Sequence, residues 1–220
     1  MNKKELLNKY LKEYRKDIKR NSLKKIGEGS MGVAYKNGNK VFKLTTDFHD
    51  FLLAREGLKR NYDFFAKVYS VDATQYGGKY FYILEVEYCG ETLRQEYLSF
   101  DSDESDNMFL SIYNEIFEVF TGNYYRGETS YFGEVKQRLI HYFDVETYNK
   151  FKLEIKYIYS TFKKLENLCR RKGLKYFDYH ASNVCLIDGK IKVIDFGFSN
   201  DREDIKQRNR FFKTFKIKTL

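Results

Sequence analysis

Proline, cysteine and long apolar runs are missing or scarce in this chain. The sequence has no proline at all, which excludes any sequence motif that contains a proline. Its three cysteines, Cys89, Cys169 and Cys185, have neither the spacing of metal ligands nor the even number of a disulfide framework. No apolar run reaches the length of a membrane span, and residues 1–5 lack the apolar stretch of a signal peptide. We therefore expect a soluble protein of a reducing, cytoplasmic compartment.

The composition is that of a small folded domain with an excess of positive charge. Hydrophobic residues make up 42% of the chain, which is enough for a core, and the length predicts one compact unit with a two-lobe division. The net charge of +9 has two interpretations: solubility combined with the codon use of an AT-rich genome, or attraction to ATP, acidic substrates or nucleic acid. The basic segment 206–218 also contains phenylalanines, which favour docking on the domain as much as binding to nucleic acid.

Side chains suited to group transfer lie close together around residue 180. Asp178 precedes Asn183 by five residues, and Asp195 opens an Asp-Phe-Gly triplet twelve residues after Asn183. Asp178 could take a proton from a hydroxyl group. Asn183 and Asp195 offer the oxygen ligands that Mg²⁺ prefers. This order and spacing are typical of a phosphotransferase active site.

A glycine-rich segment upstream predicts a loop that binds phosphate groups. Three glycines fit the pattern G-x-G-x-x-G, in which glycine lets the backbone approach a phosphate closely. They are Gly27, Gly29 and Gly32. In a dinucleotide-binding fold this pattern opens a helix, but here a β-like stretch, 33–36, leads into an Asn37-Gly38 turn. The glycines are therefore predicted to lie in a strand–loop–strand flap, with Lys43 on the return strand.

The hydrophobic periodicity predicts a succession of strands and helices. The predicted strands are 23–26, 33–36, 41–44, 66–72 and 79–87, and the predicted helices are 2–20, 48–60, 107–120 and 145–172. Thr46-Asp47 is expected to cap the second helix. The residues expected on the buried side of that helix are Phe48, Phe51, Leu52 and Leu58. A hairpin over 184–194 would present Asp195, and 122–133 has no clear assignment.

With these motifs in this order, residues 22–200 resemble the protein-kinase-like superfamily. The chain is most similar to the short protein kinase that some coliphages make early in infection. His180 stands where protein kinases usually have a lysine, so 178–183 is similar to the D-x-H-x-x-N motif of aminoglycoside phosphotransferases. The resemblance implies an α+β, bilobal fold. Its N-lobe would hold a five-stranded antiparallel sheet with one helix, and its truncated C-lobe would be mainly helical.

The resemblance also implies an organisation in four parts. A helical extension, 1–21, would precede the N-lobe, 22–88, and a basic tail, 201–220, would follow the reduced C-lobe, 89–200. The absence of proline excludes the A-P-E segment that ends the activation loop of most protein kinases. The short stretch after Gly197 is expected to leave no room for the full helical platform that positions peptide substrates.

Roles in binding ATP and Mg²⁺ follow from the same resemblance. Lys43 would neutralise the α- and β-phosphates, and Asp178 would be the catalytic base. Asn183 and Asp195 would hold Mg²⁺. His180 would either neutralise the γ-phosphate when protonated or make only a structural hydrogen bond in its loop. The residues expected to bind the nucleotide are Gly27, Gly29, Ser30, Gly32, Ala34, Lys43, Glu56, Glu87, Cys89 and Leu186.

Some of these assignments have a plain structural alternative. The resemblance implies that Glu56 pairs with Lys43, whereas an exposed Glu56–Arg60 pair at i,i+4 is the alternative. The Glu87 carbonyl and the Cys89 amide would hydrogen-bond the adenine. The residues expected to cover its two faces are Ala34 and Leu186, for which ordinary core packing is the alternative.

Three functions remain open from the sequence. The first is an ATP- and Mg²⁺-dependent Ser/Thr protein kinase of minimal phage type, acting on bacterial host proteins or on itself. The second is a small-molecule kinase of the aminoglycoside kind, against which the brevity after Gly197 counts. The third is a pseudokinase-like binding or inhibitor module. Retention of the whole catalytic set counts against that third function: Lys43, Asp178, Asn183 and Asp195.

Overall fold

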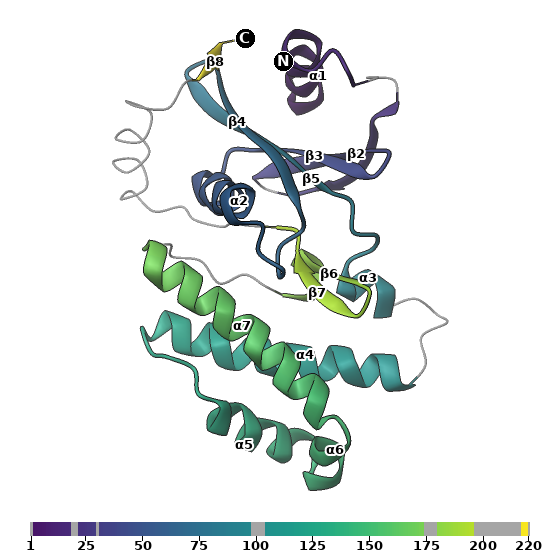
Figure 1. Cartoon of the computed structure of the whole chain (residues 1–220), viewed down its shortest axis with the longest axis vertical. Coiled ribbons are helices and arrows are strands. Elements are labelled where there is room, and N and C mark those ends of the chain that lie inside the picture. The colour runs from purple at the N-terminus through teal and green to yellow at the C-terminus, as the bar shows by residue number, and fades with distance from the viewer. Residues whose placement is uncertain are drawn as a thin grey trace. The chain divides into compact units, whose positions relative to one another are not determined.

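Residues 2–18, 22–29, 31–97, 104–173, 180–195 and 217–219 are described by a computed structural model of the protein (Figure 1). The chain divides into two compact units. Unit 1 contains the residues up to Tyr88 together with those from Phe196 onwards, and unit 2 contains Cys89–Asp195. Unit 1 is a sheet with helices and unit 2 is mainly helical, so the predicted α+β class is confirmed. Within the described residues, no helix combines the length and the apolar character needed to cross a membrane.

The sheet of unit 1 contains the five antiparallel strands that the sequence predicted. They are β1 (Lys24–Glu28), β2 (Gly32–Asn37), β3 (Lys40–Thr45), β4 (Val68–Tyr76) and β5 (Lys79–Glu87), in the spatial order β1-β2-β3-β5-β4. A sixth, short strand, β8 (Lys218–Thr219), adds to β4 in parallel. The β2–β3 and β4–β5 turns contain Gly38, Gly77 and Gly78 at positive φ, a conformation that glycine adopts without steric cost.

Helix α2 (Phe48–Arg60) follows β3 after a two-residue connection. The carboxylate of Asp47 accepts the N–H groups of His49 and Asp50, at 2.8 and 3.4 Å, so the predicted N-cap is confirmed. The helix packs against β4 and β5 and buries Phe48 and Phe51 as expected. The prediction for two other side chains was less accurate: Leu52 is half-buried and Leu58 is exposed, because the buried stripe runs through Leu53, Ala54 and Gly57 instead.

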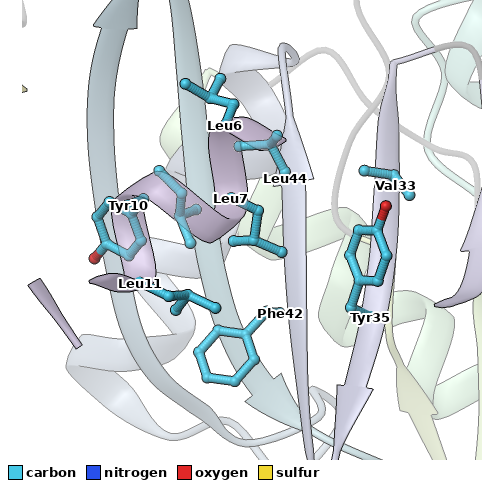
Figure 2. Close-up of a cluster of buried hydrophobic side chains, with 9 residues drawn as sticks. Leu6, Leu7, Tyr10, Leu11, Val33, Tyr35, Phe42 and Leu44 are labelled. Carbon is cyan, nitrogen blue, oxygen red and sulfur yellow. The ribbon is translucent and has the colours of Figure 1, made fainter. Parts of the chain in front are cut away.

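Helix α1 (Lys3–Tyr14) packs on the face of the sheet that carries Phe42 and Leu44 of β3 (Figure 2). Asn2 and Glu5 form a reciprocal capping box at its start, and the helix ends at Tyr14, earlier than the predicted residue 20. Its apolar side forms one cluster with residues from β2, β3 and β5. The cluster contains Leu6, Leu7, Tyr10, Leu11, Val33, Tyr35, Phe42, Leu44 and Ile83. The helix predicted as an extension is thus part of the core of unit 1.

A buried carboxylate also attaches the end of α1 to the sheet. Glu85 on β5 accepts hydrogen bonds from Arg15, from Lys40 at 2.7 Å and from Ser70 at 2.9 Å. Burial raises the pKa of Glu85, but these hydrogen bonds outweigh it and lower that pKa overall. Glu85 is therefore a satisfied, ionised acceptor that holds the residue following α1 against the sheet.

The described residues of unit 2 form five α-helices, a short 3₁₀ helix and a hairpin. The α-helices are α3 (Leu93–Tyr97), α4 (Glu104–Tyr125), α5 (Phe132–Phe143), α6 (Val145–Lys150) and α7 (Lys152–Lys172), and the hairpin strands are β6 (Val184–Ile187) and β7 (Lys190–Val193). The predicted helices at 107–120 and 145–172 and the hairpin are present, although the second helix is interrupted at Phe151. Helix α5 was not predicted, although it is amphipathic and buries Val135 and Leu139. The α4 and α7 helices pack against each other.

The packing of α1 makes a direct prediction about stability. Leu7 is fully buried in the cluster, so Leu7→Ala is expected to lower the free energy of unfolding by about 2–5 kcal/mol. Lys9 on the exposed side of the same helix is the matched control, and Lys9→Ala should change it by less than about 0.5 kcal/mol. Urea denaturation of both variants measures this difference. Equal, small effects would show that α1 does not belong to the core.

Candidate functional site

Lys43 is held inside unit 1 by a carboxylate from the first turn of α2. On β3 it lies between Ala34 of β2 and Leu84 of β5. Its Nζ is 2.6 Å from Oδ2 of Asp50, and the two side chains are 14% and 1% exposed. An ion pair this buried is stable only as a pair, because removing one partner leaves a desolvated charge. The structure therefore fixes the position of the Lys43 ammonium group.

The helix acid in contact with Lys43 differs from the one that the sequence led us to expect. The structure assigns the pairing to Asp50, whereas the carboxylate of Glu56 lies 3.0 Å from Lys59. The reason is geometric: the short connection after β3 brings the first turn of α2 next to Lys43. Glu56 is six residues further along the helix, which corresponds to roughly 9 Å of rise. The two-residue connection was the sequence signal that could have indicated Asp50.

A second buried acid, Asp47, lies at the start of the same helix. Its side chain is 1% exposed, and burial raises its pKa even though the amides of His49 and Asp50 and the charge of Lys43 lower it. Its own N–H donates to Oγ1 of Thr45 at 3.1 Å. The start of α2 therefore carries two buried carboxylates. Asp47 caps the helix and Asp50 pairs with Lys43.

The glycine flap is the turn between β1 and β2, as predicted. The N–H of Gly29 donates to the carbonyl of Gly32 at 2.9 Å, and the carbonyl of Met31 accepts from the N–H of Thr46 at 3.0 Å and from its hydroxyl group at 3.2 Å. The base of the flap is thus tied to the connection between β3 and α2. Ser30, which was expected at the tip, lies outside the described residues.

The three flap glycines are present for different physical reasons. A Cβ atom on Gly32 would lie 2.9 Å from the carbonyl oxygen of Leu44, closer than packing allows. A Cβ atom on Gly27 or Gly29 would meet nothing within 4 Å among the described residues, and neither glycine has a positive φ. The fold therefore requires glycine at position 32. At positions 27 and 29 the packing of the described residues does not require glycine.

Hydrogen bonds within unit 1 fix the end of β5, where adenine binding was predicted. The N–H of Glu87 donates to the carbonyl of Lys67 at 2.8 Å, and its carboxylate accepts the N–H of Lys67 at 3.2 Å. The N–H of Tyr88 donates to the carbonyl of Asn39 at 2.9 Å. Cys89 is half-buried and begins unit 2. The roles of the Glu87 carbonyl and the Cys89 amide remain predictions.

In unit 2, the residues expected to bind Mg²⁺ come together at the open end of the β6–β7 hairpin. The last ladder pair is Val184 with Val193. Beyond it, the carbonyl of Asn183 accepts the N–H groups of Ile194 at 3.0 Å and Asp195 at 3.4 Å. Asn183 and Asp195 are thus neighbours along the backbone just beyond the ladder, although Asp195 comes twelve positions after Asn183 in the sequence. A carboxylate and an amide oxygen are suitable ligands for Mg²⁺, which completes its shell with water and substrate phosphates.

His180 caps the short 3₁₀ helix (Ala181–Asn183) that carries Asn183. Its Nδ1 accepts the N–H of Ser182 at 3.2 Å, and its carbonyl accepts the N–H of Asn183 at 2.8 Å. The edge of its ring faces Phe117 of α4. The structural hydrogen bond that was the alternative for His180 is thus present, with Nδ1 as its acceptor.

The remaining site candidates are only partly described. Leu186 is half-buried on β6 opposite Ile191. Asp178, the expected catalytic base, lies outside the described residues, as do Phe196 and Gly197. Within the described ranges no group of three His, Cys, Asp or Glu side chains could hold a metal ion. Two protein ligands with substrate oxygens are nevertheless enough for Mg²⁺.

Aminoglycoside phosphotransferases are among the solved structures with some similarity to this chain. A thermostable mutant of aminoglycoside phosphotransferase APH(4)-Ia in its apo form is 15% identical, with a TM-score of 0.41 over 86% of this chain and 70% of that chain. A ternary complex of such a mutant with AMP-PNP and hygromycin B has a TM-score of 0.42 at 15% identity, with the same coverage. The streptomycin–ATP–APH(2″)-IIa ternary complex has a TM-score of 0.36 at 15% identity, over 89% of this chain and 71% of that chain. No family model and no curated protein matches the chain.

At this identity and at these TM-scores, the similarity transfers no activity and no residue role to the chain. A proposal for its function has to rest on its own residues.

The assignment of Asp50 can be tested against that of Glu56. Asp50→Asn is expected to lower the free energy of unfolding by roughly 3 kcal/mol, because it leaves the Lys43 ammonium group buried without its carboxylate. Glu56→Gln should cost about 1 kcal/mol or less, because its contact with Lys59 is partly solvated. Chemical denaturation measures both. The opposite ranking would restore the predicted Lys43–Glu56 pair.

The flap glycines give a second prediction. Gly32→Ala is expected to lower the free energy of unfolding by about 1–3 kcal/mol through its clash with the backbone of β3. Gly29→Ala should leave stability within about 1 kcal/mol of the original, yet weaken the binding of ATP–Mg²⁺ by about tenfold if the flap approaches the phosphates. Denaturation and calorimetric titration separate the two effects. Unchanged nucleotide affinity in Gly29→Ala would argue against a phosphate-binding flap.

Proposed function

We propose that the chain is an ATP- and Mg²⁺-dependent phosphotransferase that transfers the γ-phosphate to an alcohol acceptor. The observation that carries this proposal is the pair of backbone hydrogen bonds that joins Asn183 to the strand leading into Asp195. These backbone contacts make the two residues neighbours at the end of one hairpin, and their amide and carboxylate side chains are of the kind that binds Mg²⁺, which supports the proposal. The fixed ammonium group of Lys43 and the flap glycines that packing does not require support the same conclusion.

Phosphoryl transfer depends on positioning and charge neutralisation more than on covalent chemistry. We assign the positive charge for the α- and β-phosphates to Lys43, with Asp50 holding it in place. Asn183 and Asp195 would hold Mg²⁺, which when bound neutralises charge on the β- and γ-phosphate oxygens. The N–H groups of the flap would approach the phosphates, and Asp178 would orient the acceptor hydroxyl and take its proton.

Two classes of acceptor are compatible with these residues. The resemblance to a small phage kinase favours a Ser or Thr hydroxyl of a protein, such as a bacterial host protein or the chain itself. A hydroxyl of a small molecule is favoured by the D-x-H-x-x-N motif, in which His180 replaces the lysine usual in protein kinases. In this chain Nδ1 of His180 accepts a backbone hydrogen bond, a contact that a lysine at this position could not make.

The proposal predicts that transfer depends on Asp195. With labelled ATP, Mg²⁺ and a bacterial lysate, Asp195→Asn is expected to lose at least about a hundredfold in rate while keeping its fold, as judged by circular dichroism. Lys190→Gln on the same hairpin, an exposed position, is the matched control and should keep full rate. Full activity in Asp195→Asn would refute the metal assignment.

The same assay distinguishes the acceptors. Labelled protein bands that disappear in Asp178→Ala identify a protein kinase, and label confined to the small-molecule fraction identifies a small-molecule kinase. Absence of transfer with Mg²⁺ or Mn²⁺, alongside a tight partner in a pull-down, would contradict the proposal and favour a pseudokinase-like module.

A further inference from the structure

The side chain of Lys218 on β8 lies in a small cage on unit 1, far in sequence from every residue that forms it. Its Nζ is 2.9 Å from Oδ2 of Asp72 on β4 and 3.3 Å from the hydroxyl group of Tyr10 on α1. The same ammonium group lies over the rings of Tyr10 and Tyr14, at 5.2 and 4.8 Å from their centroids. A carboxylate together with two aromatic faces is a recognition site for an ammonium cation.

The backbone of β8 also makes contacts with β4. β8 pairs in parallel with β4, with Lys218 opposite Thr74 and Thr219 opposite Gln75. The buried hydroxyl group of Thr74 donates to the carbonyl of Lys218 at 2.7 Å. In the five antiparallel strands of unit 1, β4 is one of the two edge strands, and an edge strand presents backbone groups to which another strand can bind. Figure 1 shows β8 beside the end of β4 that lies near α1.

The cage is built by contacts that do not involve Lys218. Tyr10 is 2% exposed within the α1 cluster and donates a hydrogen bond to Asp72. Burial and this hydrogen bond raise the pKa of Tyr10, so the phenol remains a neutral donor. The Tyr10 and Tyr14 rings pack against each other with centroids 5.4 Å apart. The hydrogen bond from Tyr10 thus orients the carboxylate of Asp72 independently of Lys218.

We propose that Tyr10, Tyr14, Asp72 and the free side of β4 at Thr74–Gln75 form a docking site for an extended, lysine-bearing peptide segment, which residues 217–219 of this chain occupy. The short strand supplies the backbone pairing typical of strand addition at a sheet edge. The cage supplies the selectivity for lysine. The proposal is independent of the phosphotransferase function.

The first experiment uses hydrogen–deuterium exchange on the full chain. Lys218→Met keeps the length of the side chain but removes its charge, so the exchange of peptides covering residues 74–76 and 217–219 should become about tenfold faster. Lys218→Arg keeps both the cation–π contact and the ion pair and is the matched control, with exchange close to that of the original chain. Unchanged exchange in Lys218→Met would show that the cage does not hold the strand.

The second experiment tests recognition of a separate peptide. In Lys218→Glu, repulsion from Asp72 should vacate the cage, so a fluorescent peptide with the sequence of residues 214–220 should bind. The same peptide with methionine in place of its second lysine is the control, and it should bind at least about tenfold more weakly. Tyr14→Leu in the Lys218→Glu chain should remove this preference while α1 remains folded. Equal binding of the two peptides, or binding of neither, would overturn the proposal.

Discussion

The alternation of side chains along β3 is the constraint on which unit 1 depends. Phe42 and Leu44 point into the cluster beneath α1, and Lys43 between them points to the other face, where Asp50 receives it. Because the side-chain period of a strand is two, a shift of one residue would place the lysine in the apolar cluster and the two apolar side chains against the acids of α2. Apolar packing on one face therefore sets the position of the cation on the other.

In unit 2, strand register likewise sets the positions of polar residues. The ladder of β6 and β7 ends with Val184 opposite Val193, both buried, and the carboxylate and amide that could bind Mg²⁺ lie just beyond this pair. The cap that His180 provides sets the direction in which the chain enters this ladder. The spacing between Asn183 and Asp195 is thus a consequence of hairpin register, and a hairpin has a local sequence signal. For this reason the amino-acid pattern was enough to indicate that the two residues are neighbours.

Features decided by neighbouring residues could be predicted, and features decided by distant contacts could not. The turns at Gly38 and at Gly77-Gly78, the cap at Asp47 and the β6–β7 hairpin each follow from local backbone chemistry. For Lys43 the resemblance indicated the mid-helix acid Glu56, whereas the structure shows an ion pair with Asp50, which the two-residue connection after β3 brings close. Strand β8 had no local signal, since two residues without their partners from α1 and β4 show no pattern. The role of Asp178 is still a prediction.

Lys43 and Lys218 show how the surroundings of a lysine decide whether its contact is permanent or reversible. Withdrawal of Lys43 would leave the carboxylate of Asp50, 1% exposed, as a buried charge without its cation, which is unfavourable by several kcal/mol. Withdrawal of Lys218 would leave Asp72, 22% exposed, still accepting the hydrogen bond of Tyr10 and open to water. The first pair therefore belongs to the folded core of unit 1. The second is a contact between a preformed site and a ligand, and such a contact can exchange without unfolding the sheet.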